Sequence, residues 1–260
     1  MSDDCVCDEG DQIFTEEVIG PYSLWLSIAD DDFNANKKTL FATMIWHGAR
    51  ALSNYLASEV PNLIKGKSVI EFGSGAGLPS LICSKIGASC VTSSDYPAPS
   101  VIQNLRTNAL RNVANVCSVK EKADDNVTNF TNENSPAGDN CRLIERNFHV
   151  IEHTWGEDVT PLLQPLQGGL YDTVIASECL WKSDTHENFA TSIDNVLKPG
   201  GTAHLSFSHH IPGLESNDLS FFDILKRRNF IVTRITETIV PHMWSDRSAV
   251  VYIYDVMKCP

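Results

Sequence analysis

Residues Val69–Leu81 read VIEFGSGAGLPSL, and this stretch decides the fold. The apolar residues of 69–72 predict a buried strand, Gly73–Gly77 predict a turn, and Leu78 begins a predicted helix. Glycine suits such a turn because it allows left-handed backbone angles and lets a ligand press against the main chain. The free N–H groups at a helix start attract polar or anionic atoms. The stretch therefore predicts a ligand site.

The glycine spacing indicates which ligand is bound. Dinucleotide-binding turns have the spacing G-x-G-x-x-G, whereas this turn has G-x-G-x-G with an acid, Glu71, two residues ahead of it. A second predicted strand, Cys90–Ser94, ends at Asp95, where an acid can hold ribose hydroxyls. The combination favours a nucleoside cofactor, and it resembles that of class I S-adenosyl-L-methionine-dependent methyltransferases more than that of dehydrogenases. The alternative is a purely structural turn.

Strands and helices alternate along the rest of the chain, which is typical of a parallel sheet with helices on both faces. We expect an α/β fold of the Rossmann-like class I type, with a mostly parallel seven-stranded sheet. The expected helices are 44–56, 78–86, 100–111, 185–197 and 221–226, and the further expected strands are 148–156, 171–177, 202–208, 231–239 and 249–256. Residues 161–169 are expected to be a loop.

Length and composition predict one domain with appendages, since 260 residues at 42 % hydrophobic content can bury one substantial core. Residues 1–21 are rich in acids and are expected to be a disordered tail, whereas residues 22–260 form the domain. Within it, residues 113–145 lack periodicity and predict a flexible insertion.

Several function classes are disfavoured by composition. The net charge is −13, and residues 1–32 hold ten acids and no base, so we expect no nucleic-acid partner and tolerance of a basic protein. An acidic tail that only keeps the protein soluble is the alternative. No apolar run approaches the roughly 20 residues of a membrane span, and no secretory signal is recognisable, so a cytoplasmic monomer is expected. The eight cysteines lack zinc-site spacing, and no metal is expected.

The chain resembles the seven-stranded methyltransferases of family 16, which mostly methylate protein lysines. The segments that carry the resemblance are IWHGARALSNYL, KGKSVIEFGSGAGLPSLI, VTSSDYP, HTWGED, VIASECLW, FSHHIP and DLSFFDILKRRNF, within residues 44–256. The most similar branch, first labelled nicotinamide N-methyltransferase-like, modifies the N-terminal residue and adjoining lysine of translation elongation factor 1-alpha. The resemblance thus implies S-adenosyl-L-methionine as cofactor and that factor as partner.

The resemblance also implies a set of cofactor contacts at the strand ends. Gly73, Ser74 and Gly75 would lie against the methionine and ribose part, Glu71 would also bind the cofactor, and Asp95 would take the ribose hydroxyls. The remaining implied contacts are Trp155 near adenine, Ser177 at the end of the fourth strand, and Trp46 from the first helix. Except for Trp46, these residues follow or end predicted strands, where open α/β sheets bind ligands.

Four residues are candidates to line the channel for the target amine: Tyr96, Glu178, Trp181 and His209. Each has an alternative role. Tyr96 and Trp181 are equally suited to packing at the sheet edge, and Glu178 to capping the segment that follows it. The alternative for His209, and for His210 beside it, is an exposed loop position. Because the two are adjacent, we expect at most one of them to face the pocket. Family members usually have Asp at the position of Glu178. The Glu side chain is one methylene longer than that of Asp and reaches further.

These observations leave three functions open. The first is methylation of a protein amine, either an N-terminal α-amine or a lysine. The second is N-methylation of a small nicotinamide-like molecule. The third is a non-catalytic module that binds the cofactor and regulates a partner.

Overall fold

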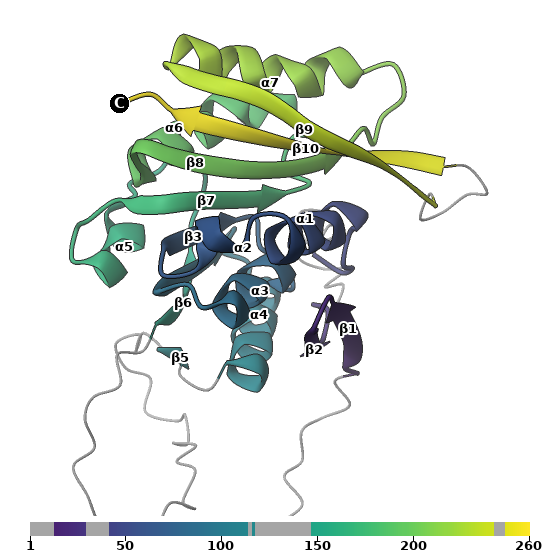
Figure 1. Cartoon of the computed structure of the whole chain (residues 1–260), viewed down its shortest axis with the longest axis vertical. Helices are drawn as coiled ribbons and strands as arrows, with labels where there is room; N and C mark the ends of the chain where they lie inside the picture. The colour runs from purple at the N-terminus through teal and green to yellow at the C-terminus, as the bar shows by residue number, and fades with distance from the viewer. Residues whose placement is uncertain (1–12, 30–41, 114–115, 118–146, 242–247) are drawn as a thin grey trace, which may run out of the picture.

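The computed structural model describes residues 13–29, 42–113, 116–117, 147–241 and 248–260 (Figure 1). In these residues, eight strands form the main sheet in the order β5-β6-β4-β3-β7-β8-β10-β9. The strands are β3 (Ser68–Phe72), β4 (Cys90–Asp95), β5 (Val116–Cys117), β6 (Phe148–Glu152), β7 (Tyr171–Ser177), β8 (Leu197–Ser208), β9 (Phe230–Pro241) and β10 (Ser248–Lys258).

The sheet is parallel except at one edge. In the sheet order β5-β6-β4-β3-β7-β8, each strand runs parallel to its neighbours. Strand β10 runs antiparallel to both β8 and β9. Apart from the two-residue strand β5, this is the mostly parallel seven-stranded sheet that the sequence predicts. The expected fold class is confirmed.

Helices cover both faces of the sheet (Figure 1). They are α1 (His47–Ser58), α2 (Pro61–Ile64), α3 (Leu78–Ile86), α4 (Pro99–Asn112), α5 (Thr160–Leu163), α6 (His186–Val196) and α7 (Glu215–Arg227). One buried core joins α1–α4 to the sheet through residues such as Val69, and the other joins α5–α7 through residues such as Ile70. Successive residues of β3 thus serve opposite cores, as the pleat of a strand requires.

The structure corrects several sequence expectations. Residues 161–169 are not a continuous loop, because α5 and a 3₁₀ turn (Gln164–Leu166) occupy most of them. Strand β6 ends at Glu152, so Trp155 lies in the turn after it. The predicted insertion lies mostly outside the described residues, as do residues 1–12 of the predicted tail.

Part of the predicted tail is ordered. Strand β1 (Thr15–Ile19) pairs antiparallel with β2 (Tyr22–Leu26) to form a hairpin. Arg50 of α1 makes an ion pair with Glu17 of this hairpin, and Ile19, Leu24 and Leu26 are buried in the core with α1–α4. Burial of these apolar side chains offsets the entropy cost of ordering the segment. The acidic composition had suggested that too few apolar residues were available for this.

A row of asparagines on α4 holds the end of the hairpin and the residue that follows it. Asn112 bonds both the N–H and the carbonyl of Trp25, and Asn108 does the same for Ser27. Asn104 also donates to the Ser27 carbonyl, at 3.0 Å. Side chains four residues apart share one helix face, so α4 presents three amides to an extended backbone.

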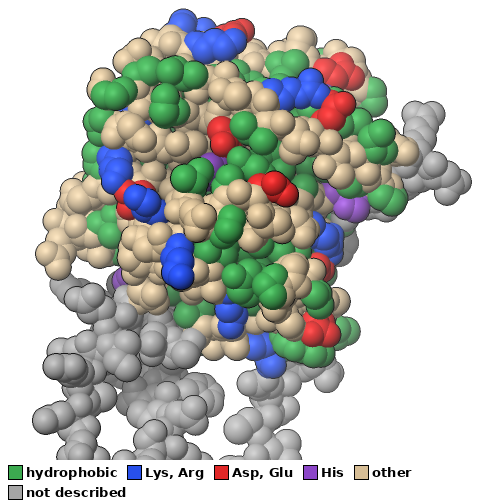
Figure 2. All heavy atoms as spheres, viewed as in Figure 1, with side chains coloured by type: hydrophobic (Ala, Val, Ile, Leu, Met, Phe, Trp, Pro, Cys, Tyr) green, Lys and Arg blue, Asp and Glu red, His purple; other side chains and the backbone are tan. Residues whose placement is uncertain are grey.

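One face of the described residues is mixed in charge. Figure 2 shows basic and acidic side chains interspersed with apolar ones over the visible face. Among the described residues, no helix is long and apolar enough to cross a membrane.

Candidate functional site

A cavity of about 570 Å³ opens at the carboxyl ends of the parallel strands. This is where open α/β sheets place their ligands, and the volume is in the range of small-molecule sites. The wall includes the glycine turn, the ends of β4 and β7, the turn after β6, the segment before α1, and His210 beyond β8. Its members include Trp46, Gly73, Ser74, Gly75, Asp95, Tyr96, Trp155, Ser177, Glu178, Trp181 and His210.

The three glycines of the turn all have positive φ, at 64° for Gly73, 53° for Gly75 and 82° for Gly77. A Cβ on Gly73 would lie 2.7 Å from Cys179 Sγ, and one on Gly77 would lie 2.6 Å from Leu105 Cδ1. At Gly75 a Cβ would meet nothing within 4 Å. The outer glycines are therefore required by packing, while the main chain of Gly75 is open to a ligand in the cavity.

Asp95 ties the end of β4 to this turn. One carboxylate oxygen accepts from the N–H of Gly75 and the other from the N–H of Tyr96, both at 2.6 Å. Desolvation raises the pKa of Asp95, while these two N–H donors act to lower it. A carboxylate offers about four acceptor sites, so Asp95 retains capacity to bind ligand hydroxyls.

Glu71 lies behind the turn and does not line the cavity. It is fully buried, and Oε2 accepts from the N–H and the hydroxyl of Ser80 in α3. Oε1 has no hydrogen-bond partner among the described residues. Desolvation raises the pKa of Glu71 to about 8. The structure thus places this predicted cofactor-binding residue where it holds the start of α3 rather than on the cavity wall.

Aromatic rings form two parts of the wall. The Trp155 ring lies 4.4 Å from that of Phe189 in α6, at 31° between the planes. Trp46 ends the segment that leads into α1, and its ring meets the edge of His210 at a centroid distance of 5.0 Å. Sequence reasoning placed Trp46 on resemblance alone, because it lies off the apolar stripe of its helix.

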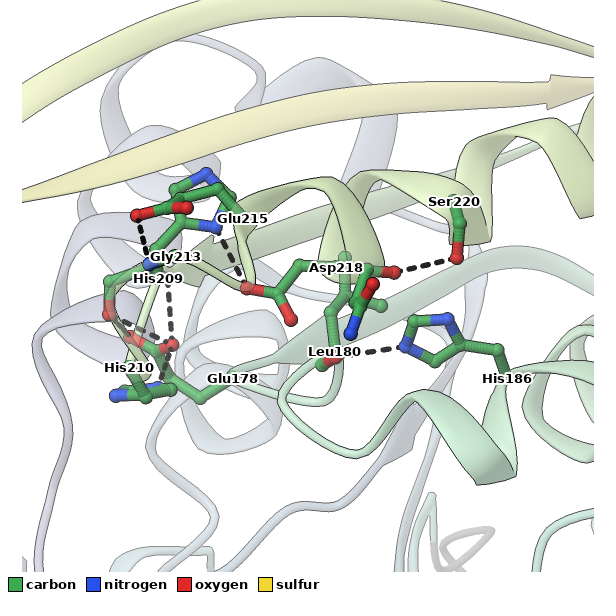
Figure 3. Close-up of polar contacts among 11 residues, drawn as sticks. Glu178, Leu180, His186, His209, His210, Gly213, Glu215, Asp218 and Ser220 are labelled. Carbon is green, nitrogen blue, oxygen red and sulfur yellow. Dashed lines mark hydrogen bonds and ion pairs between the residues drawn. The ribbon is translucent and has the colours of Figure 1, made fainter.

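Glu178 follows β7 with a positive φ of 55°, and its buried carboxylate joins three segments. Oε1 accepts from the Gly48 N–H in the first turn of α1, at 3.0 Å. Oε2 accepts from the Ser208 N–H at the end of β8, at 2.9 Å, and the Ser208 hydroxyl lies within 3.1 Å of both oxygens. His210 Nε2 lies 2.9 Å from Oε2 (Figure 3).

His209, which we predicted to line the channel, is not among the residues of the cavity wall, whereas the adjacent His210 is. His209 Nδ1 lies 2.8 Å from Asp218 of α7 (Figure 3), and its ring packs against Phe207 and Tyr252. His210 lines the cavity in its place. Strand β8 ends at Ser208, so strand alternation no longer fixes the direction of either side chain.

Sequence reasoning missed other wall residues. His153, Cys179 and Lys182 line the cavity. His153 is buried with Nε2 2.9 Å from the Ser192 hydroxyl, and desolvation lowers its pKa. The position of His153 directly after β6 was the available signal, because the ends of parallel strands converge on the site.

Comparisons with known proteins agree with this geometry. Residues 29–123 match the model of a family described as lysine methyltransferase. The chain is 33 % identical over 186 residues to the protein N-terminal and lysine N-methyltransferase EFM7 of Yarrowia lipolytica, with 72 % of this chain and 63 % of the relative covered. The protein of the same name from Aspergillus fumigatus is 26 % identical over 205 residues, with 77 % and 69 % covered. The chain thus spans slightly less than two thirds of the Yarrowia relative's length.

Two solved structures share the fold at low identity. The 16S rRNA N2 G1207 methyltransferase RsmC of T. thermophilus, in complex with AdoMet and guanosine, has a TM-score of 0.54 at 13 % identity, with 95 % of this chain and 50 % of that chain covered. P. horikoshii TYW2, in complex with MeSAdo, has a TM-score of 0.52 at 14 % identity, with 96 % and 73 % covered. These likenesses show a class I methyltransferase fold.

Proposed function

We propose that this chain, whose residues 29–123 match the lysine methyltransferase family, is an S-adenosyl-L-methionine-dependent N-methyltransferase of protein amines. Its target is an N-terminal α-amine, a lysine, or both, and it acts as a cytoplasmic monomer. One observation carries the proposal. The cavity combines the open main chain of Gly75 with the carboxylate of Asp95, which is bonded to it.

The wall residues fit this cofactor. Gly73, Ser74 and Gly75 would lie against its methionine and ribose part, and Asp95 would accept from the ribose hydroxyls. Further contacts are assigned to Trp155 beside adenine, Ser177 at the end of β7, and Trp46 directly before α1. The open space at Gly75 and the spare acceptor sites of Asp95 support these assignments.

When bound, the cofactor supplies a methyl group on a sulfonium that an amine can attack. The chain's own contribution is to hold the amine in line, and such alignment is worth about 7–11 kcal/mol. The amine must also be neutral. An α-amino group has an ordinary pKa of about 7.7–8.0, whereas that of lysine is about 10.4. The site therefore has to remove a proton, and the need is greater for lysine.

We infer that the substrate is translation elongation factor 1-alpha. Relatives named as protein N-terminal and lysine N-methyltransferases support a protein target. The acids in residues 1–32 also suit a basic polypeptide.

The test is to incubate the purified protein with radiolabelled S-adenosyl-L-methionine and a hypomethylated cell lysate, and to map labelled bands by mass spectrometry. Labelled elongation factor 1-alpha, lost in Asp95→Ala and retained in the control Asp223→Ala on the exposed face of α7, is the expected result. Label on a small amine would replace the proposal with small-molecule methylation. Cofactor binding without any transfer would replace it with a regulatory role.

A further inference from the structure

We propose that His210 is the group that takes the proton from the target amine, and that Glu178 is a positioning residue that fixes the tautomer of His210. This inference rests on the proposed function, because it concerns the amine that reacts there. His210 lies on the cavity wall beside Trp46. It is half-buried, with 19 % of its side chain exposed.

The carboxylate of Glu178 is already committed to the protein. The N–H groups of Gly48 and Ser208, the hydroxyl of Ser208 and the His210 ring all contact it within 3.1 Å. A carboxylate has about four acceptor sites, so these four donors use its capacity. Glu178 is therefore poorly placed to receive an amine directly, although it lines the cavity.

The contact with Glu178 determines which nitrogen of His210 is free. A buried carboxylate accepts hydrogen bonds, so the Nε2 atom at 2.9 Å carries the proton. The second nitrogen, Nδ1, then holds a lone pair, and Figure 3 shows it on the side of the ring away from Glu178. Within the described residues, Glu178 is the hydrogen-bond partner of the ring. A base oriented by a carboxylate is a recurring catalytic arrangement.

The proton and electron changes balance in this arrangement. Nδ1 takes one proton from the ammonium form of the substrate, which frees the nitrogen lone pair. That pair forms the new N–C bond to the methyl group, while the C–S bond breaks and its electron pair stays on sulfur. The imidazolium is stabilised by Glu178 at Nε2 and later returns its proton to solvent.

Other wall residues serve this role less well. His153 is buried, and desolvation lowers its pKa, which makes it a weaker base than an ordinary imidazole. Asp95 is bonded to the glycine turn, and Lys182 pairs with Asp184. The remaining titratable side chains that face the cavity are Tyr96, Glu178 and Cys179. The buried thiol of Cys179 has a pKa well above its ordinary value because of desolvation, so it is protonated at neutral pH.

The test compares His210→Gln with the matched control His209→Gln, since the adjacent histidine bonds Asp218 outside the cavity. Methylation of recombinant elongation factor 1-alpha is measured from pH 6 to 9, together with S-adenosyl-L-methionine affinity. We expect His210→Gln to lose about 100-fold in kcat near pH 7, with unchanged cofactor affinity. The deficit should shrink as pH rises, because more of the amine is then neutral without a base.

Three outcomes would overturn the assignment. One is a deficit that stays constant across the pH range, which indicates a structural role. Another is equal activity of the two variants. The third is an Nδ1–H tautomer of His210 in ¹⁵N-histidine spectra of the full chain, which needs no substrate. A wild-type protein that transfers no methyl group would overturn the proposed function itself, and this outcome is distinguishable because the wild type is measured first.

Discussion

The carboxylate of Glu178 and the backbone N–H of Gly48, which are 130 positions apart in the chain, are joined by a hydrogen bond of 3.0 Å. A Cβ on Gly48 would lie 2.5 Å from Glu178 Oε1, so the contact leaves no room for any side chain at position 48. Ser206 adds a second tie by donating its hydroxyl to the Gly48 carbonyl at 2.8 Å. The first turn of α1 is thereby fixed to the ends of β7 and β8.

Substitutions of Gly48 and Glu178 should partly compensate for each other in their effect on the free energy of unfolding. Gly48→Ala should destabilise the fold by about 1–3 kcal/mol through overpacking. Glu178→Asp should cost about 1–2 kcal/mol because the shorter acid no longer reaches all its donors. Combined, they should cost less than the sum, because the shorter acid leaves room for the methyl group. Urea unfolding of the four proteins gives the coupling energy; strict additivity would contradict the contact.

Removing the charge of Glu178 should affect turnover more than cofactor binding. Glu178→Gln retains the shape, but an amide stabilises a charged His210 ring less well than a carboxylate. We expect kcat to fall by at least about tenfold, with little change in the dissociation constant for S-adenosyl-L-methionine. Steady-state kinetics and calorimetry measure the two quantities. Equal losses in both would show that Glu178 acts by shaping the cavity.

Asp95 should govern cofactor affinity. Asp95→Asn removes the charge that we assign to ribose hydroxyls, and charge-assisted hydrogen bonds contribute about 1.5–3 kcal/mol. Binding of S-adenosyl-L-methionine should therefore weaken by about 10- to 100-fold. Asp172→Asn is the matched control, because Asp172 bonds Ser68 and Lys198 at the opposite ends of the strands. If both variants weaken binding alike, the assignment to ribose fails.

Glu71 should make stability depend on pH. Its folded-state pKa is about 8, compared with an ordinary value of 4.5, so between these values the folded state holds a proton that the unfolded state has released. Stability must then fall as pH rises through this window. Glu71→Gln mimics the protonated acid and should remove that slope. Urea unfolding at pH 5, 6.5 and 8 compares the two proteins; parallel pH dependences would refute the assignment.

Asn108 should couple the N-terminal hairpin to the glycine turn. Its buried amide donates to the carbonyls of Ser27 and Ala76. Asn108→Ala leaves buried partners unsatisfied, at about 1–3 kcal/mol each, and should also weaken cofactor binding. Asn112→Ala is the control, since Asn112 bonds Trp25 but not the turn. Thermal unfolding and calorimetry test both variants. If the control weakens cofactor binding equally, the contact with Ala76 has no special role.

Much of the sheet could be predicted because its signals are local. Helix α3 has the predicted bounds, since Gly77 and Gly87 lie at its two ends, and β7 is an apolar run of strand length. The hairpin was missed because its acids indicated disorder, while the contacts that order it come from Arg50 in α1 and Asn112 in α4, at 33 and 87 positions of separation.

The sequence predicts which residues line the cavity where these residues lie at strand ends, but not where they lie in other segments. Asp95 and Ser177 occupy such ends, and the structure places both on the cavity wall. Whether His209 or His210 faces the cavity depends on their contacts with Asp218 and Glu178, which no periodicity encodes. Glu71 fits the motif spacing, but the spacing does not reveal that its side chain points behind the turn.

The asparagine row on α4 also bears on where the protein can be cut. The family match begins at residue 29, so a recombinant fragment trimmed to that boundary would lack Trp25 and Ser27. Asn104, Asn108 and Asn112 would then face water where they now hold a main chain. The hairpin is thus packed as part of the domain, even though it precedes the segment that matches the family.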